Sequence, residues 1–147
     1  MVAKTIDMQL MRYINLFERI SRVSTTDCFV YNNTIYFAVP KKLVMSAVGR
    51  NGENVKHIAE TLGRKIKIVA MPNEADLDQD LFNAVKNFLI EVVAPIEFTG
   101  FDLVDGIATL SGSRESKAIL IGRDRVKEKE LAAVLERTFG IKEFKIA

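Results

Sequence analysis

The chain has 147 residues, 48% of them hydrophobic and 27% charged, and its formal net charge is +2. This composition is typical of a globular protein with one domain or two small ones. No apolar run approaches the roughly 20 residues that a membrane span requires, and Lys4, Asp7 and Arg12 do not suit a secretory signal. Cys28 is the single cysteine, which excludes an internal disulfide and favours a reducing, cytoplasmic compartment and a buried, unreactive thiol.

The net charge hides an asymmetry between the two halves of the chain. Residues 1–72 contain 11 Lys and Arg against 5 Asp and Glu, or +6, whereas residues 73–147 contain 10 against 14, or −4. A basic first half favours an anionic partner on that side of the protein.

The first half alternates between helical and strand-like patterns. The pair Asn32-Asn33 separates two β-rich runs, and asparagine tolerates the positive φ that a tight hairpin turn requires. Gly63 suits the end of a helix. The expected elements are a helix over 5–23, strands over 28–31 and 34–39, a short helix from Lys41 to Gly49, a helix over 53–62 and a strand over 65–70.

The second half repeats this order. Asp105-Gly106 is a strong hairpin signal, and Pro95 and Gly140 each mark the end of a helix. The expected elements are a helix over 76–93, strands over 101–104 and 107–110, a helix containing Ala118, Ile119 and Ile121, a helix containing Leu131, Val134 and Leu135, and a strand over 141–146.

A shift of 73 residues superimposes the two halves. It places Asn32-Asn33 on Asp105-Gly106 and Gly49 on Gly122, while the closing glycines Gly63 and Gly140 lie 77 apart. The second copy therefore has about four extra residues after its loop. A repeat of this period predicts two small domains, each with the order α-β-β-α-α-β.

The chain is organised around Gly49-Arg50-Asn51-Gly52, which lies between two helical patterns. Two glycines with a basic residue between them let backbone N–H groups approach a phosphate closely, since no Cβ intervenes. The helix that follows points its positive N-terminal end at the same place. The sequence therefore predicts a phosphate-binding loop rather than a plain turn.

A GXXG loop between two helices resembles the KH domain, a module that clamps single-stranded nucleic acid. The repeated order resembles type II KH domains, so we expect an α+β fold with two tandem type II KH domains, each a three-stranded sheet packed by helices. Residues 1–72 would form the first, with its GXXG loop, and residues 73–147 the second, with a degenerate loop. The pair resembles the archaeal NusA-like transcription factors, most specifically at residues 48–56 and 120–125.

This resemblance implies single-stranded RNA binding in transcription termination or antitermination, with RNA polymerase or a transcription complex as a further partner. From the residues themselves we expect no cofactor, no membrane association and no enzymatic activity. The second loop departs from the family pattern because it ends in Arg125 where a glycine is expected. The candidate RNA-binding residues are Lys41, Lys42, Val48, Gly49, Arg50, Asn51, Gly52, Val55, Lys56 and Ile58 in the first unit and Gly122, Arg123, Asp124, Arg125 and Lys127 in the second.

Some of these residues have a second interpretation. Val48, Val55, Ile58 and Ile66 either line an apolar groove for bases or belong to the core. The cations of the stretch 64–67 either contact RNA or form a solvated strand face.

Other features argue against an enzyme or a metal site. His57 is expected on a helix surface, and the acids Asp76, Asp78 and Asp80 complement a helix N-terminus better than they match a calcium loop, which requires glycine where Leu81 stands. Two other functions stay open: a KH-type RNA-binding protein of translation or ribosome assembly, and a protein-interaction module that has lost RNA affinity.

The link over 71–75 contains Pro72 and is short. It predicts that the two units form one rigid body. On this view RNAs of about eight nucleotides bind more tightly than RNAs of about four, because each KH unit clamps about four.

Overall fold

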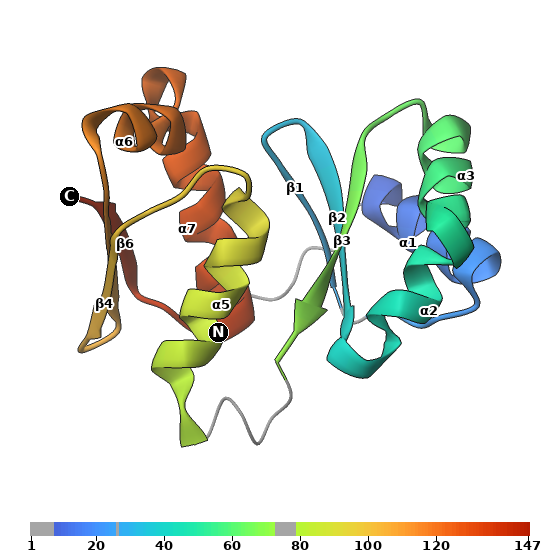
Figure 1. Ribbon diagram of the computed structural model, residues 1–147, viewed down its shortest axis with the longest axis horizontal. Helices are drawn as coiled ribbons and strands as arrows, with labels where there is room; N and C mark the ends of the chain where they lie inside the picture. Colours follow the sequence, from blue (N-terminus) through green and yellow to red (C-terminus); the bar gives the residue numbers. More distant parts are fainter. Residues whose placement is uncertain (1–7, 26, 73–78) are drawn as a thin grey trace. The chain divides into compact units, whose positions relative to one another are not determined.

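The computed structural model describes residues 8–25, 27–72 and 79–147 (Figure 1). The chain divides into two compact units, Met1–Met71 and Pro72–Ala147. Residues 5–7 of the first expected helix, Thr26, and residues 73–78 of the link and second long helix lie outside the described residues. Each unit has one three-stranded sheet packed by helices, so the predicted α+β fold with a repeated α-β-β-α-α-β order is confirmed.

The elements of the first unit follow the expected order. Helix α3 begins and ends at the predicted residues, and Gly63 ends it in the left-handed conformation, as predicted. The bounds are α1 Met8–Ser21, β1 Asp27–Tyr31, β2 Thr34–Pro40, the 3-10 turn η1 Lys41–Leu43, α2 Val44–Val48, the 3-10 turn η2 Arg50–Gly52, α3 Glu53–Leu62 and β3 Ile66–Met71.

The second unit repeats the arrangement with a longer last helix. Helix α7 has 14 residues where α3 has 10, which accounts for the four extra residues predicted after the second loop. The bounds are α5 Leu81–Val93, β4 Gly100–Val104, β5 Ile107–Ser111, α6 Arg114–Ile121, η3 Arg123–Arg125, α7 Val126–Phe139 and β6 Glu143–Ile146.

Both predicted hairpin turns are present. Asn32 and Asn33 have φ of 51° and 61°, and Asp105 and Gly106 have φ of 52° and 80°. Two consecutive positive φ values match the right-handed twist of the strands on either side. Each turn therefore fixes the register of its hairpin, with Tyr31 opposite Thr34 in the first unit.

The two sheets have the same topology. In each, the first two strands are antiparallel and the second and third are parallel, in the order β1-β2-β3 and β4-β5-β6. A parallel pair needs a crossover, which here consists of two helices and the loop between them. The third strand lies at the edge of its sheet, so no other strand of that sheet pairs with its outer side.

The core of the first unit lies between one face of its sheet and its helices. Alternate residues of β2, Ile35, Phe37 and Val39, are fully buried there, as the period of two along a strand requires. The rings of Phe37 and of Phe17 on α1 stack with their centroids 4.5 Å apart. Cys28 is buried in this cluster, as predicted.

The second unit buries the apolar stripe expected for its long helix, including Val85, Phe88 and Leu89. Asp80 caps this helix, because its carboxylate accepts a hydrogen bond from the backbone N–H of Asn83 at 3.1 Å. The side-chain and backbone hydrogen bonds from Asn83 lower the pKa of Asp80. Asp76 and Asp78 lie outside the described residues. Within the described ranges, no helix is long and apolar enough to span a bilayer.

Candidate nucleic-acid interface

The loop between α2 and α3 is built from left-handed backbone. Gly49 has φ 83°, Asn51 φ 55° and Gly52 φ 74°. The N–H of Gly52 donates to the carbonyl of Gly49 at 3.2 Å, which closes a tight turn. Arg50 and Asn51 are exposed at its tip, directly before the N-terminus of α3. The loop thus presents exposed backbone beside the positive end of a helix, as an anion site requires.

The two glycines of this loop have different roles. A Cβ on Gly49 would lie 2.9 Å from the side-chain Cγ and Nδ2 of Asn54, which is closer than real contacts allow. The Asn54 amide donates to the carbonyl of Ser46 at 3.3 Å and so connects α3 to α2 across the loop. A Cβ on Gly52 would meet nothing within 4 Å. Gly49 is therefore required for packing, whereas Gly52 leaves open space in front of the loop.

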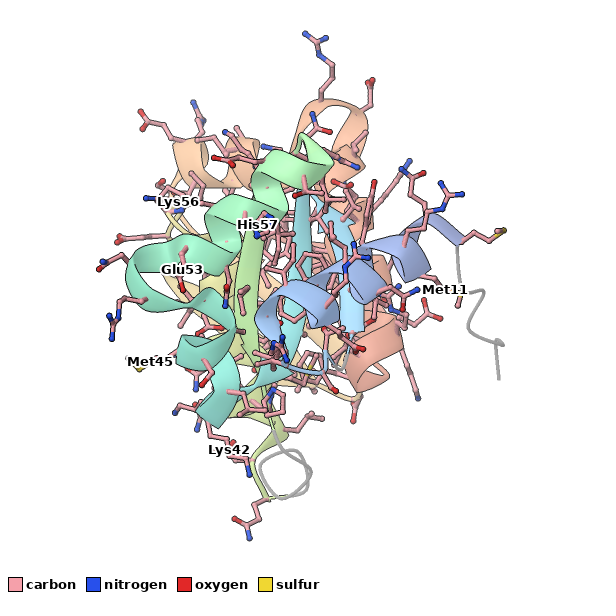
Figure 2. The ribbon with its side chains drawn as sticks, turned by 90° about the vertical axis from the view of Figure 1, so that its right-hand side faces the viewer. Met11, Lys42, Met45, Glu53, Lys56 and His57 are labelled. Atoms are coloured by element: carbon pink, nitrogen blue, oxygen red, sulfur yellow. The ribbon has the colours of Figure 1, made fainter. Side chains whose placement is uncertain are left out.

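The predicted cations of the first unit are exposed around this loop. Lys41 and Lys42 lie on η1, Arg50 lies in the loop, and Lys56 lies on the second turn of α3. Figure 2 shows Lys42 and Lys56 along the same side of the view, with Met11 of α1 on the other side. Cations on one side of the unit suit a chain of phosphates.

The predicted apolar groove is partly corrected by the structure. Val48, Val55 and Ile66 are half-buried and border the loop and the last strand, so each keeps some surface for a ligand. Ile58 is 0% exposed and packs in the core beneath α3. It cannot contact a base, because its position on the helix turns its side chain inward to the buried cluster. Ile58 instead packs α3 against the core.

Other charged candidates are also placed by the structure. The guanidinium of Arg64 donates to the hydroxyl of Tyr13 at 3.3 Å, so it connects α1 to the start of β3. The ammonium of Lys67 lies 6.0 Å from the centre of the Tyr36 ring. His57 is exposed on α3, as predicted. Among the described residues, no group of His, Cys, Asp and Glu could hold a metal ion.

The second loop has the same backbone with different side chains. Gly122, Asp124 and Arg125 have φ of 75°, 56° and 60°, close to the values at Gly49, Asn51 and Gly52. Arg125 thus adopts a left-handed conformation that a residue with a Cβ rarely occupies. The carboxylate of Asp124 stands where the first loop has the neutral Asn51.

The cations of the second loop are only partly directed to solvent. Arg123 is exposed at the tip of the loop. The stem of Lys127 is half-buried, and a Cβ on Gly122 would lie 2.9 Å from its Cγ, so this stem occupies the place that Asn54 takes in the first unit. Arg125 forms an ion pair with Glu128, with Nη1 and Oε1 3.0 Å apart. The second loop therefore offers fewer unpaired cations than the first.

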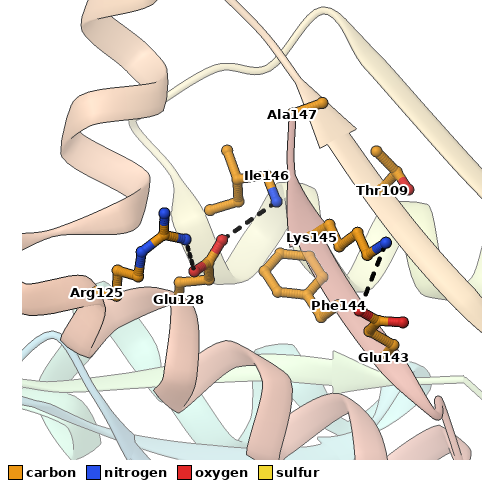
Figure 3. A pocket seen from close by; sticks show the side chains of 8 residues that line it. All are labelled: Thr109, Arg125, Glu128, Glu143, Phe144, Lys145, Ile146 and Ala147. Atoms are coloured by element: carbon orange, nitrogen blue, oxygen red, sulfur yellow. Dashed lines mark hydrogen bonds and ion pairs between the residues drawn. The ribbon is translucent and has the colours of Figure 1, made fainter.

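Sequence reasoning missed two features of the site. Met45, on α2, is 86% exposed and lies on the same side as Lys42 and Lys56 in Figure 2. Glu128 lies in a cleft of about 480 Å³ beside the second loop (Figure 3). The 73-residue shift that revealed the repeat also pairs Glu128 with Val55, so the exchange of an apolar residue for an acid was visible in the sequence.

Three comparisons with known proteins bear on the identity of the chain. Residues 34–83 match the KH domain family. Over 146 residues the chain is 24% identical to a protein of Halococcus morrhuae named "Probable transcription termination protein NusA", and the alignment covers 97% of the chain and 98% of that relative. A solved structure, "Crystal structure of APE1850", superimposes with a TM-score of 0.64 at 26% identity and covers 97% of this chain and 100% of that one.

Two methanogen relatives match a shorter region. Proteins of the same name from Methanocaldococcus jannaschii and Methanococcus vannielii are 30% and 31% identical over 84 residues. The matched region is 57% of this chain but only 40% and 43% of those relatives. The aligned part of the chain therefore covers less than half of either relative.

The two sheets, the loop between paired helices and the family match define a KH-domain protein with tandem units. KH domains bind single-stranded nucleic acid through such loops. Within this class the chain is an archaeal NusA-like KH protein, since its curated relatives are archaeal proteins that bear the NusA name.

Proposed function

We propose that the chain binds single-stranded RNA through the first GXXG loop and acts in transcription termination or antitermination. The observation that carries the RNA-binding part is the left-handed loop from Gly49 to Gly52, with open space in front of Gly52 and exposed cations around it. A KH loop of this form holds the backbone of about four nucleotides while bases enter the adjoining groove.

The exposed cations give this site its affinity and its salt dependence. Arg50 and Lys56 flank the loop, and Lys41 and Lys42 extend the positive surface along η1. Half-buried Val48 and Val55 offer apolar surface for a base beside them. In the second unit, Arg123 and Lys127 contribute phosphate contacts, and Gly122 gives its loop the same backbone path.

The test is a titration of the full chain with a labelled single-stranded RNA of mixed sequence, about eight nucleotides long, which two KH units of about four nucleotides each can hold. The variant Asn51→Asp/Gly52→Asp places two carboxylates and added bulk against the phosphate. We expect its affinity to fall at least about tenfold, or about 1.4 kcal/mol, with the thermal transition little changed. Unchanged affinity in the folded variant would overturn the proposal.

A matched control separates a local effect from a change of net charge. Asn15 on α1 and Asn87 on α5 are exposed helical residues outside the loop. The variant Asn15→Asp/Asn87→Asp adds the same two charges, and we expect its affinity to change by less than about twofold at moderate salt, because exposed distant charges are screened.

The transcriptional role rests on the names of the relatives. Affinity purification of the full chain from its native cells tests it. We expect RNA polymerase subunits to co-purify in a way that survives nuclease treatment. Recovery of ribosomal subunits without polymerase would instead favour the role in translation or ribosome assembly.

A further inference from the structure

The second unit has a cleft at the place where its sheet edge meets its loop. The cleft has a volume of about 480 Å³ and lies between the start of α7 and the outer side of β6 (Figure 3). Arg125 and Glu128 line one wall, and Phe144 and Ile146 line the other. By volume it has room for a single planar group such as a nucleic-acid base.

The two strand registers show which residues of the first unit correspond to this cleft. The 73-residue shift pairs Gly52 with Arg125 and Val55 with Glu128. Ile68 pairs with Phe37 in the first sheet, and Ile146 pairs with Leu110, the counterpart of Phe37, in the second. The corresponding place in the first unit is therefore bordered by a glycine and a valine, neither of which has a side-chain acceptor.

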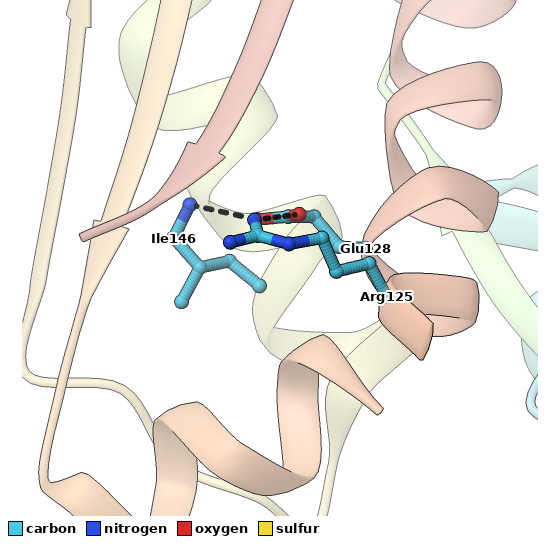
Figure 4. A network of polar contacts seen from close by, with 3 residues as sticks. All are labelled: Arg125, Glu128 and Ile146. Atoms are coloured by element: carbon cyan, nitrogen blue, oxygen red, sulfur yellow. Dashed lines mark hydrogen bonds and ion pairs between the residues drawn. The ribbon is translucent and has the colours of Figure 1, made fainter. Parts of the chain in front are cut away.

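Glu128 accepts hydrogen bonds from two donors that line the second cleft. Its Oε2 accepts from the backbone N–H of Ile146 at 3.3 Å, and its Oε1 accepts from Nη1 of Arg125 at 3.0 Å (Figure 4). The N–H of Ala147 donates to Leu110 on β5, so the N–H of Ile146 points to the opposite, outer edge of β6. Outer-edge amides are the groups with which a sheet pairs an incoming ligand. Here that donor already has an intramolecular partner.

The same carboxylate also makes the cleft unfavourable for RNA. The side chain of Glu128 is only 12% exposed, so its charge is poorly screened by water, whereas the side chain of its ion-pair partner Arg125 is 68% exposed. A base that entered beside Glu128 would find the outward N–H of Ile146 already engaged. To pair with that N–H it would have to displace Glu128, and the carboxylate would lose this donor.

We propose that Glu128, held by Arg125 and by the Ile146 amide, makes the second cleft unfavourable for bases because it engages the edge amide with which a base would pair, so that the second unit contacts RNA only through its loop cations. This inference rests on the proposed RNA-binding function. It assigns the difference between the units to one exchanged pair, Gly52 and Val55 in the first unit against Arg125 and Glu128 in the second.

The test removes the Arg125 and Glu128 side chains from the second cleft in a chain whose first loop no longer binds RNA. In the Asn51→Asp/Gly52→Asp background, Arg125→Gly/Glu128→Val gives the second unit the residues of the first. We expect the full chain to bind a labelled eight-nucleotide single-stranded RNA at least about tenfold more tightly than the background variant, the scale expected for one base contact. If Val reduces folding, as judged by the thermal transition, Arg125→Gly/Glu128→Ala replaces it.

A matched control separates the effect of the hydrogen bond to the Ile146 amide from the effect of the Glu128 charge. Arg125→Gly/Glu128→Gln removes the negative charge but keeps an acceptor of the same size for the Ile146 amide. We expect it to gain much less affinity than the Val variant. An equal gain, or no gain in the folded Val and Ala variants, would overturn the inference. Because the gain is read without the first loop, failure of the wild-type chain to bind RNA would count against the proposed function alone.

The reciprocal exchange places the same pair of residues beside the first loop. Gly52→Arg/Val55→Glu places an arginine where a Cβ meets nothing within 4 Å, in a backbone conformation that Arg125 already adopts. We expect RNA affinity to fall at least about tenfold, and less for Gly52→Arg/Val55→Gln. Unchanged affinity in the folded Glu variant would contradict the role assigned to Glu128.

Discussion

In the first unit, the loop from Gly49 to Gly52 ends in a glycine with open space before it, and a valine stands one turn further along α3. In the second unit, a loop with nearly the same φ values ends in Arg125, and Glu128 stands at the corresponding place. Two loops with nearly the same backbone therefore present different side chains. In our proposal, the side chains that follow each loop decide whether a base can bind beside it.

The difference extends to charge. The half of the chain that holds the GXXG loop carries +6, and the half that holds the second loop carries −4. Phosphate contacts supply much of the affinity for nucleic acid. The first unit is the more basic one, and it has Val55 where the second unit has Glu128. Both properties support our proposal that RNA binds mainly to the first unit.

The first test of the difference between the units is to add a methyl group to the first glycine of each loop. Gly49→Ala should destabilise the protein by about 2–3 kcal/mol, because it combines positive φ with a clash against the Asn54 amide that connects two helices. Gly122→Ala should cost about 1 kcal/mol less, because it meets only side-chain carbons of Lys127, whereas Gly49→Ala also meets the backbone N of Asn54 at 3.1 Å. Urea denaturation of both variants measures this difference, and equal losses would show that the two loops are packed alike.

The second is to neutralise matched pairs of lysines. Lys41→Ala/Lys42→Ala should reduce the slope of log K against log salt by roughly 0.7 for each phosphate that the lysines no longer neutralise. Lys127→Ala/Lys129→Ala in the second unit should reduce it less, since we assign fewer phosphates to that loop. Titrations at four or more salt concentrations measure the slopes. A larger change in the second pair would reverse the assignment of the main site.

The third concerns the ion pair at the second loop. Arg125→Ala should change the free energy of unfolding by less than about 1 kcal/mol, because its guanidinium is largely exposed and such pairs contribute little. Relief of the positive φ is not expected, since alanine also has a Cβ. Denaturation at low and high salt checks this. A large, salt-independent loss of unfolding free energy would mean that Arg125 is needed for the fold itself and does not act only through its ion pair with Glu128.

Much of the fold could be predicted from sequence because its signals are local. The hairpin turn at Asn32-Asn33 depends on residues that tolerate positive φ, and the bounds of α3 depend on a glycine at each end. The repeat was visible because these local signals recur at one shift. The rigid association of the two units remains a prediction for calorimetry.

The site was less predictable because its key contacts are distant in sequence. The hydrogen bond from Ile146 to Glu128 joins residues 18 apart, and that from Arg64 to Tyr13 joins residues 51 apart. The resemblance to KH domains offered both Val55 and Ile58 to the groove, with the core as the other interpretation. Only packing shows that Ile58 is fully buried while Val55 keeps some surface.

An amide-resolved NMR titration of the full chain with an eight-nucleotide single-stranded RNA shows most directly which loop binds RNA. We expect the largest shifts at Arg50, Asn51, Gly52 and the first turn of α3, with small shifts at the second loop. The Ile146 amide should stay unperturbed, because it already donates to Glu128. Shifts at Ile146 and the second cleft as large as those at the first loop would contradict the assignment of the main site to the first unit.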